Sequence, residues 1–489
     1  MRVNHRHRPV PRHPVAAFLF FALLASGIST APARAQNPTS ATNPYWGSVT
    51  AQPVTDVPLR LSLDDAVRRG LTNNLGLKQA ENGENALHGE KDQVEQVFLP
   101  TITAGADTGY YMHNLAALGF SPSTIDKFSK LFPGGKAPAG FNEITRDTLT
   151  DGKVQLTQVL FSAPAIAAYK AAGAAERSSY FAKMSARGEV VQQVAGAYLR
   201  ALADDSEVQN AQAQLMQAQV LEQHAHEAHV AGTAANLDEL RAQVELQSQQ
   251  QALIAAENQQ AKDLILLKRE IGVDPAQQLA LTDPAPFSEL ATQTPEELRA
   301  LAYKSRQDYQ NLQNQVVVYK ALHDSARAER LPSLTFYSYY QVSTVTTVST
   351  RGNFIAMGNL SFPIFREAQV RGDEQASQAN LGAVNAQLDE LRNHIDEQVR
   401  AALLDVNANA KLVEVARSNV DLATRALSDE TDRVNAGVDD NLPLVTAQAT
   451  LASAQTNLVE SLYQYNVSKL ALARAAGVLE QQYRVYLGE

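Results

Sequence analysis

The chain has 489 residues, 45% of them hydrophobic, and a formal net charge of -10. This hydrophobic content argues against a mostly disordered protein, and the acidic balance provides no basic surface for phosphates, so no nucleic-acid partner is expected. The absence of cysteine excludes disulfides, thiolate metal sites and a lipid-modified N-terminal cysteine.

Residues 1–35 have the three parts of a secretory signal peptide. Four arginines precede an apolar run over residues 15–28, and Ala33-Arg34-Ala35 provides a small-x-small cleavage site before Gln36. The run is shorter than the roughly 20 residues that a transmembrane helix needs. We expect export of a mature chain that begins at Gln36. No later segment has 18 consecutive apolar residues, so strands would have to make any crossing of a membrane.

The rest of the chain contains an internal repeat, the feature that most constrains a fold. Leu99-Pro100 matches Leu331-Pro332 at an offset of 232, Leu160-Phe161 matches Ile364-Phe365 at 204, and Gly232 matches Gly437 at 205. The change of offset places an insertion of about 28 residues in the first copy, near residues 112–150. The predicted units are a first repeat (36–272), a linker (273–293), a second repeat (294–477) and a C-terminal tail (478–489).

Each copy is expected to begin with one helix, followed by two strands. Residues 63–96 and 294–330 are rich in helix-forming residues, have acidic first turns and end near a proline. From residue 102 to residue 112, apolar side chains alternate with polar or small ones, as in a strand with one apolar face. Its partner is predicted at residues 154–161, and the second pair at 334–348 and 353–362.

These strands have two interpretations. One is a small soluble hairpin packed on helices. The aromatic residues at the strand ends and the small residues on an apolar face favour membrane barrel strands instead. Four strands cannot close a barrel, because small barrels need about eight, so subunits would have to pool their strands.

Two very long helices are predicted after the strands. Residues 163–230 and 366–433 lack proline after Pro164, and at about 1.5 Å per residue each would be roughly 100 Å long. Their apolar residues recur at intervals of seven, which is typical of coiled coils. The returning helices, 237–271 and 443–476, are about half as long and would each stack end to end with a helix from the strand side. The predicted fold is mainly α, a long helical tunnel with four strands per protomer. A soluble coiled-coil rod fits the helices equally well but leaves the strands unexplained.

The order and duplication of these landmarks resemble the TolC family of outer-membrane factors across essentially the whole mature chain. The resemblance rests on Phe98-Leu99-Pro100 and Arg330-Leu331-Pro332 before the strands, Leu160-Phe161 and Phe362-Pro363-Ile364-Phe365 after them, and hairpin signatures at 230–243 and 435–448. It implies a homotrimer whose twelve pooled strands form one transmembrane β-barrel in outer-membrane lipid, above a helical tunnel in the periplasm. The insertion near residues 112–150 would then be an extracellular loop.

In that family the two hairpin turns form the periplasmic tip, where an adaptor docks and the tunnel closes. The resemblance therefore makes six turn residues candidates for adaptor docking: Ala231, Gly232, Thr233, Ala436, Gly437 and Val438. The alternative is that the glycines only cap their helices, because glycine readily adopts the left-handed conformation that such caps need.

The gate residues of the family are not all present. Pro443 and Thr446 stand where the pattern has aspartates, while Val434 and Asp439 replace a tyrosine and an arginine. We hypothesise that Asp238, Asp439 and Asp440 of the three subunits form rings of carboxylates at the constriction. Such rings would make the constriction acidic and favour cations. Solvated turn carboxylates without a gating role are the alternative.

A histidine-rich stretch, with His224, His226 and His229 between Glu222 and Glu227, has the composition of a metal cluster. Neighbours on a helix lie three or four residues apart, so only His226, His229 and Glu222 share a face, and no metal site is expected. No phosphate loop, zinc-protease motif or nucleophile elbow is found. We expect no catalytic residue, no cofactor and no enzymatic activity.

The sequence thus predicts a passive exit duct of a tripartite efflux system, supplied by an inner-membrane pump and a periplasmic adaptor. Type I secretion, in which the same duct passes unfolded polypeptide, is an alternative. An alternative of another class is a periplasmic coiled-coil adaptor or scaffold without a pore. Drug efflux, metal efflux and protein secretion all remain open.

Overall fold

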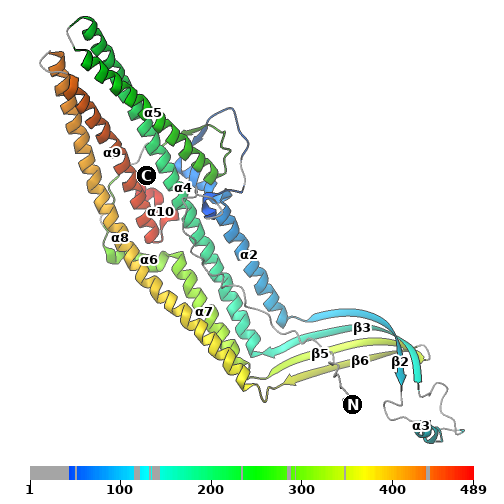
Figure 1. Ribbon diagram of the computed structural model, residues 1–489. Helices are drawn as coiled ribbons and strands as arrows, with labels where there is room; N and C mark the ends of the chain where they lie inside the picture. Colours follow the sequence, from blue (N-terminus) through cyan, green and yellow to red (C-terminus); the bar gives the residue numbers. More distant parts are fainter. Residues whose placement is uncertain are drawn as a thin grey trace, which may run out of the picture.

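The computed structural model describes residues 43–49, 52–114, 122–130, 134, 144–232, 235–283, 288–291, 293–345, 348–436 and 441–488. The predicted signal peptide, residues 1–35, lies outside them. The molecule is elongated, with a curved sheet at one end and two helical hairpins at the other (Figure 1). In the described part of the chain, no helix is long and apolar enough to cross a membrane.

The sheet contains the four predicted strands in the antiparallel order β2-β3-β5-β6. They are β2 (Thr101–Asn114), β3 (Ile144–Ser162), β5 (Ser333–Val345) and β6 (Val348–Ser361). The β3–β5 pairing joins the two repeats. β3 begins earlier than the sequence pattern predicts, because it pairs with β2 as far as Asn114. Parts of the segment 112–150 are therefore strand, and another part forms α3 (Pro122–Ser129).

The strand register gives the sheet two chemically different faces. On the apolar face, Val154 of β3 pairs with Tyr340 of β5, which pairs with Phe354 of β6, and all three side chains are exposed. On the polar face, Lys153 Nζ donates a hydrogen bond to Tyr337 Oη at 3.1 Å and lies 4.4 Å from the centroid of the Tyr339 ring. This separation follows from the alternation of side chains along a strand.

The long helices are present as predicted. They are α4 (Ala163–Val230) and α8 (Glu367–Asn435), with 68 and 69 residues, and they return as α5 (Asn236–Ile271) and α9 (Asn441–Ala475). α4 begins where it does because Ser162 Oγ accepts a hydrogen bond from Ala165 N at 3.3 Å and Pro164 lies in the first turn, a favourable helix start.

The prediction of one continuous helix before each strand pair was wrong. Each copy has two helices, α1 (Leu63–Asn73) and α2 (Leu75–Glu95), then α6 (Pro295–Ser305) and α7 (Gln307–Ala328). The chain is extended at the two joints, with ψ of 133° at Asn74 and 123° at Arg306. At the first joint Asn74 Oδ1 accepts hydrogen bonds from Gly76 N and Leu77 N, so the side chain competes with the helical backbone and caps α2 instead.

Two further parts of the structure had no sequence signal. In the linker, β4 (Leu279–Leu281) pairs in parallel with β1 (Leu59–Leu61). The tail forms α10 (Leu479–Leu487), which buries Leu479, Tyr486 and Leu487. Two single-turn helices, η1 (Pro44–Trp46) and η2 (Gln96–Phe98), complete the described elements.

The main hydrophobic core lies at the waist of the molecule, where the two repeats meet. It combines Val194 and Tyr198 of α4 with Ile271 of α5, Leu472 of α9 and Leu487 of α10. Among the described residues toward the tips there are two small clusters, one of which joins Leu221, Ala225, Ala242 and Leu444. Because few apolar contacts hold them, we expect the tips to open locally at a lower free energy than the waist.

A lysine is fully buried in the waist. Lys469 of α9 has no exposed surface, and its Nζ donates a hydrogen bond to the backbone oxygen of Ser288 at 3.2 Å. Burial lowers the pKa of Lys469 to about 8. The fold therefore disfavours the charged form of this lysine at neutral pH.

We expect Lys469→Met to stabilise the protein by roughly 3 kcal/mol at pH 7, because each unit of pKa shift corresponds to about 1.4 kcal/mol. The folded-state pKa of Lys469 lies below the unfolded value of about 10.4. The free-energy cost of burying the charge is therefore complete below pH 8, falls as the pH rises above 8, and disappears near pH 10.4. Urea unfolding in detergent at pH 7 and pH 9.5 would measure it. A gain that does not shrink at the higher pH would contradict the assignment to charge.

Candidate functional site

The turn of the first hairpin lies at the outer end of the helices. Ala231 N donates to Glu227 O at 3.0 Å, and Gly232 N donates to His229 O at 2.9 Å. Gly232 has a φ of 75°, which favours glycine whether or not a partner binds. Ala231, Gly232 and Ala436 are all exposed and thus accessible for docking. The other predicted docking residues, Thr233, Gly437 and Val438, lie outside the described residues.

The predicted gate residue Asp238 is in the first turn of α5. Its Oδ1 accepts a hydrogen bond from Arg241 Nη1 at 3.2 Å, and its side chain is only 18% exposed. Arg241 was missed by the sequence analysis, although its spacing of three residues on a helix was an available signal. The ion pair offsets part of the negative charge of Asp238. Asp439 and Asp440 lie outside the described residues.

Two histidines near the end of α4, His226 and His229, face α5. His226 Nδ1 lies 2.8 Å from Glu239 Oε1, and His229 Nε2 lies 3.7 Å from Glu239 Oε2. The hydrogen bond with Glu239 raises the pKa of His226. Across the described ranges, no group of three or more potential ligands is arranged to hold a metal. The contacts of His226 and His229 with Glu239 connect α4 to α5 beside the turn.

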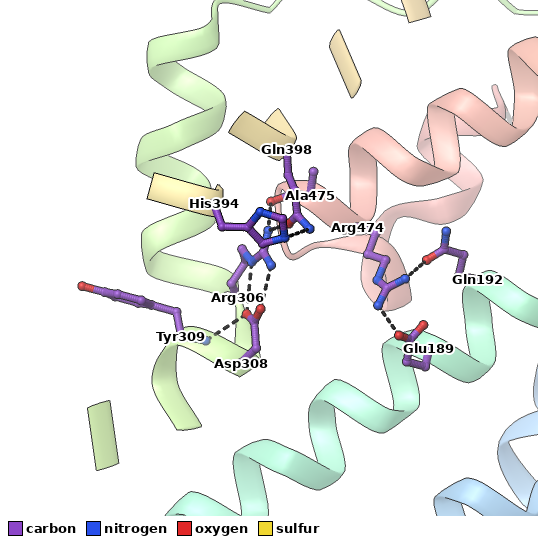
Figure 2. A network of polar contacts seen from close by, with 9 residues as sticks. All are labelled: Glu189, Gln192, Arg306, Asp308, Tyr309, His394, Gln398, Arg474 and Ala475. Carbon is purple, nitrogen blue, oxygen red and sulfur yellow. Dashed lines mark hydrogen bonds and ion pairs between the residues drawn. The ribbon is translucent and has the colours of Figure 1, made fainter. Parts of the chain in front are cut away.

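At the waist, Arg306 holds the joint between α6 and α7 (Figure 2). Its guanidinium donates to both oxygens of Asp308, at 3.0 and 2.6 Å, to Gln398 Oε1 of α8 at 2.7 Å and to the backbone oxygen of Ala475 at 3.4 Å. Burial by itself would raise the pKa of Asp308, but the hydrogen bonds from Arg306 outweigh it and hold this pKa below its usual value. The joint is thereby attached to α8 and to the end of α9.

A second arginine connects the end of α9 to the first repeat. Arg474 Nη1 donates to Gln192 Oε1 of α4 at 2.5 Å, and its Nη2 donates to Glu189, as Figure 2 shows. A cavity of about 100 Å³ lies beside Arg306 and Arg474. The charged groups Arg306, Asp308 and Arg474 on its wall are already engaged with protein partners. The sequence analysis singled out neither arginine.

Comparison with known proteins gives a consistent result. The family described as "Outer membrane efflux protein" matches residues 66–273 and 298–478. The alkaline protease secretion protein AprF of Pseudomonas aeruginosa is 25% identical over 338 residues, which cover 67% of this chain and 69% of AprF. The outer membrane protein TolC of Escherichia coli is 23% identical over 124 residues, 25% of each chain. The solved structure of the outer-membrane channel OprN has a TM-score of 0.70 at 16% identity, over 92% of this chain and 98% of OprN.

Proposed function

Because the chain belongs to the outer membrane efflux protein family, we propose that three copies assemble into a passive exit duct, which an inner-membrane pump and a periplasmic adaptor supply. The protein is an outer-membrane channel rather than an enzyme. Energy would come from the pump, and cargo would pass without chemical change. A pore-free adaptor or scaffold is not supported, because the family match spans both repeats.

The observation that supports this function best is the two-faced sheet. Its apolar face is exposed in the single chain, while its other face has a network of Lys153, Gln155 and tyrosines. Within the chain, β2 and β6 are edge strands. Three copies that pool their sheets into a twelve-stranded barrel would pair all edges, place the apolar face against lipid and leave the polar face toward water. The part of the segment 112–150 that lies between β2 and β3 would then lie outside the cell.

The hairpin tips are the proposed place of adaptor docking and opening. The exposed turn residues Ala231, Gly232 and Ala436 support it, and the docking set includes Thr233, Gly437 and Val438. The tips have little core of their own, so an adaptor that binds the open arrangement more tightly would shift the population toward it. The tunnel would extend into the periplasm, and residues 1–35 would direct export.

The proposed constriction is acidic and comprises Asp238, Asp439 and Asp440 of each subunit. The ion pair with Arg241 refines this proposal, because it reduces the share that Asp238 contributes to the field. Asp439 and Asp440 would then supply most of the cation selectivity.

Single-channel recording in planar bilayers tests the duct and its selectivity. We expect cation-selective openings of the wild-type protein. The cation-to-anion permeability ratio should fall toward one in a variant with Asp238, Asp439 and Asp440 changed to Ala. The same ratio should rise in Arg241→Ala, because the ion pair that offsets the charge of Asp238 is removed. The control is Asp56→Ala, which removes an exposed carboxylate from the N-terminal segment. This variant should leave the permeability ratio unchanged. Openings whose selectivity no variant alters would reject the acidic constriction, and a complete absence of openings would reject the duct.

The likeness to AprF favours type I secretion as a second candidate function, because that relative is named for the secretion of an alkaline protease. The same duct would then pass an unfolded polypeptide. The test is a strain in which the gene for this chain is deleted. If that strain no longer secretes a particular protein but keeps the wild-type sensitivity to small toxic compounds, secretion is selected over small-molecule efflux.

A further inference from the structure

Arg306 fixes the orientation of the Gln398 amide at the waist. The guanidinium of Arg306 has only N–H groups, which donate hydrogen bonds and cannot accept them. Its Nη1 lies 2.7 Å from Gln398 Oε1, and the reversed amide would place Nε2, a second donor, at this position. Gln398 therefore keeps Oε1 toward Arg306 and directs Nε2 toward the next residue of the network, His394 (Figure 2).

The orientation of Gln398 determines the hydrogen bonding of His394. Gln398 Nε2 and His394 Nε2 are 2.8 Å apart, and since the amide nitrogen is a donor, the ring nitrogen has to accept. An imidazole nitrogen accepts only when it has no proton, so this contact requires the neutral ring with its proton on Nδ1. On that side of the ring, Nδ1 lies 3.5 Å from Glu397 Oε2. The contacts in Figure 2 are thus those of the unprotonated histidine.

Protonation of His394 conflicts with the hydrogen bond between Gln398 and Arg306. With a proton on Nε2, the ring and the amide would present two donors to each other. A reversed amide would satisfy the ring but would present its NH₂ group to the guanidinium, so one of the two contacts is lost in either arrangement. The His394 side chain is 45% exposed, and protons reach it from solvent. Arg306 is only 9% exposed, so water has little access to replace the acceptor that it loses.

The charges around His394 do not remove this conflict. They come from three elements, with Glu390 and Glu397 on α8, Arg306 and Asp308 at the α6–α7 joint, and Arg474 at the end of α9. The two glutamates favour a protonated ring, but both are exposed, and the nearer one, Glu397, is 78% exposed, so their attraction is weak. Asp308 has both oxygens engaged by Arg306, and Arg474 is engaged with α4.

We propose that His394 is a proton-sensitive lock of the waist. The unprotonated ring holds Gln398 on Arg306 and so fastens the α6–α7 joint to α8, whereas protonation releases Gln398 and loosens the joint. Histidine changes its charge between pH 5 and pH 8, so the lock is closed at pH 8 and opens as the pH falls through this range. The joint of the first repeat is held by the side chain of Asn74, which does not titrate. Acid therefore acts on one of the two joints.

Hydrogen exchange of the purified full-length protein in detergent tests the lock. The measured quantity is the protection factor of the amides of Arg306 and Gln310, which donate to Ala302 O and Arg306 O. A protection factor compares each amide with an unstructured peptide at the same pH, so the chemical effect of pH on exchange cancels. We expect it to fall by roughly tenfold from pH 8 to pH 5.5, because a hydrogen bond to a charged group contributes on this order. The amides of Asn74 and Lys78 at the first joint are the internal control and should keep their protection.

Three substitutions separate the protonation of His394 from other effects of acid. His394→Gln keeps an acceptor that takes up no proton in this range, and the joint should stay protected at both pH values. His394→Lys supplies only donors, and the joint should be poorly protected at both. The matched control is His323→Gln, because His323 Nδ1 lies 3.2 Å from the hydroxyl of Ser377, which can donate or accept. This variant should keep the pH dependence of the wild-type protein.

Three results would overturn the lock. They are protection of the second joint that does not change with pH in the wild-type protein, a pH dependence that persists in His394→Gln, and a joint that stays protected at pH 8 in His394→Lys. None of them bears on the exit duct, which the planar-bilayer recordings test separately.

Discussion

Val154→Arg is expected to abolish assembly of the protein in the outer membrane, whereas Gln155→Arg is expected to be tolerated. The two residues are neighbours on β3 and lie on opposite faces of the sheet. An arginine on the lipid-facing side of a barrel costs about 2–4 kcal/mol near the middle of the bilayer. Because every subunit of the proposed trimer has the substitution, the cost is incurred three times per barrel.

Fractionation of membranes that express each variant would measure this effect. The amount of detergent-extracted trimer should fall below detection for Val154→Arg and stay within about twofold of wild type for Gln155→Arg, which adds a cation to a face that already bears Lys153. Equal tolerance of both variants would mean that the apolar face does not contact lipid.

Gly477→Ala is expected to destabilise the waist by roughly 2–5 kcal/mol, from left-handed backbone strain and overpacking together. Gly477 has a φ of 76°, and a methyl group there would lie 2.6 Å from Arg306 N and 2.8 Å from Arg306 Cα. Both obstacles are backbone atoms of the α6–α7 joint, which cannot rotate away as the end of a side chain can. The substitution therefore forces the end of α9 away from the joint.

Gly232→Ala is the matched control, because Gly232 has a nearly identical φ of 75° and a methyl group there would meet no atom within 4 Å. Only the backbone strain, about 1–2 kcal/mol, should remain. Urea unfolding of both variants in detergent measures the difference. If the two variants lose the same stability, the close approach of Gly477 to Arg306 has no energetic importance.

The periodic elements of this protein could be predicted from the sequence. The alternation at Ile102, Ala104 and Ala106 indicated the strands, and the heptad spacing over α4 and α8 indicated the long helices. These signals are local, because the burial of one face imposes the period of the element on the residues within it. The duplicated landmarks also predicted the family, which the match over both repeats confirms.

The candidate site was predicted only in part. The turn at Gly232 follows from a residue type that the left-handed cap requires, but the partner of Asp238 was missed. The docking and gate roles of the tip residues stay predictions, and several of those residues lie outside the described ones.

By itself, the sequence determined the order and type of the main elements and the length of the two long helices, because their periods are set by neighbouring residues. Only the tertiary structure decided where the helices before the strands break, how the strands pair in register, and which side chains connect the two repeats at the waist. Arg306 binds Gln398, which is 92 residues away, and Arg474 binds Gln192, which is 282 residues away. Such contacts leave no local pattern, because their energy depends on which distant side chain the fold brings within hydrogen-bonding distance.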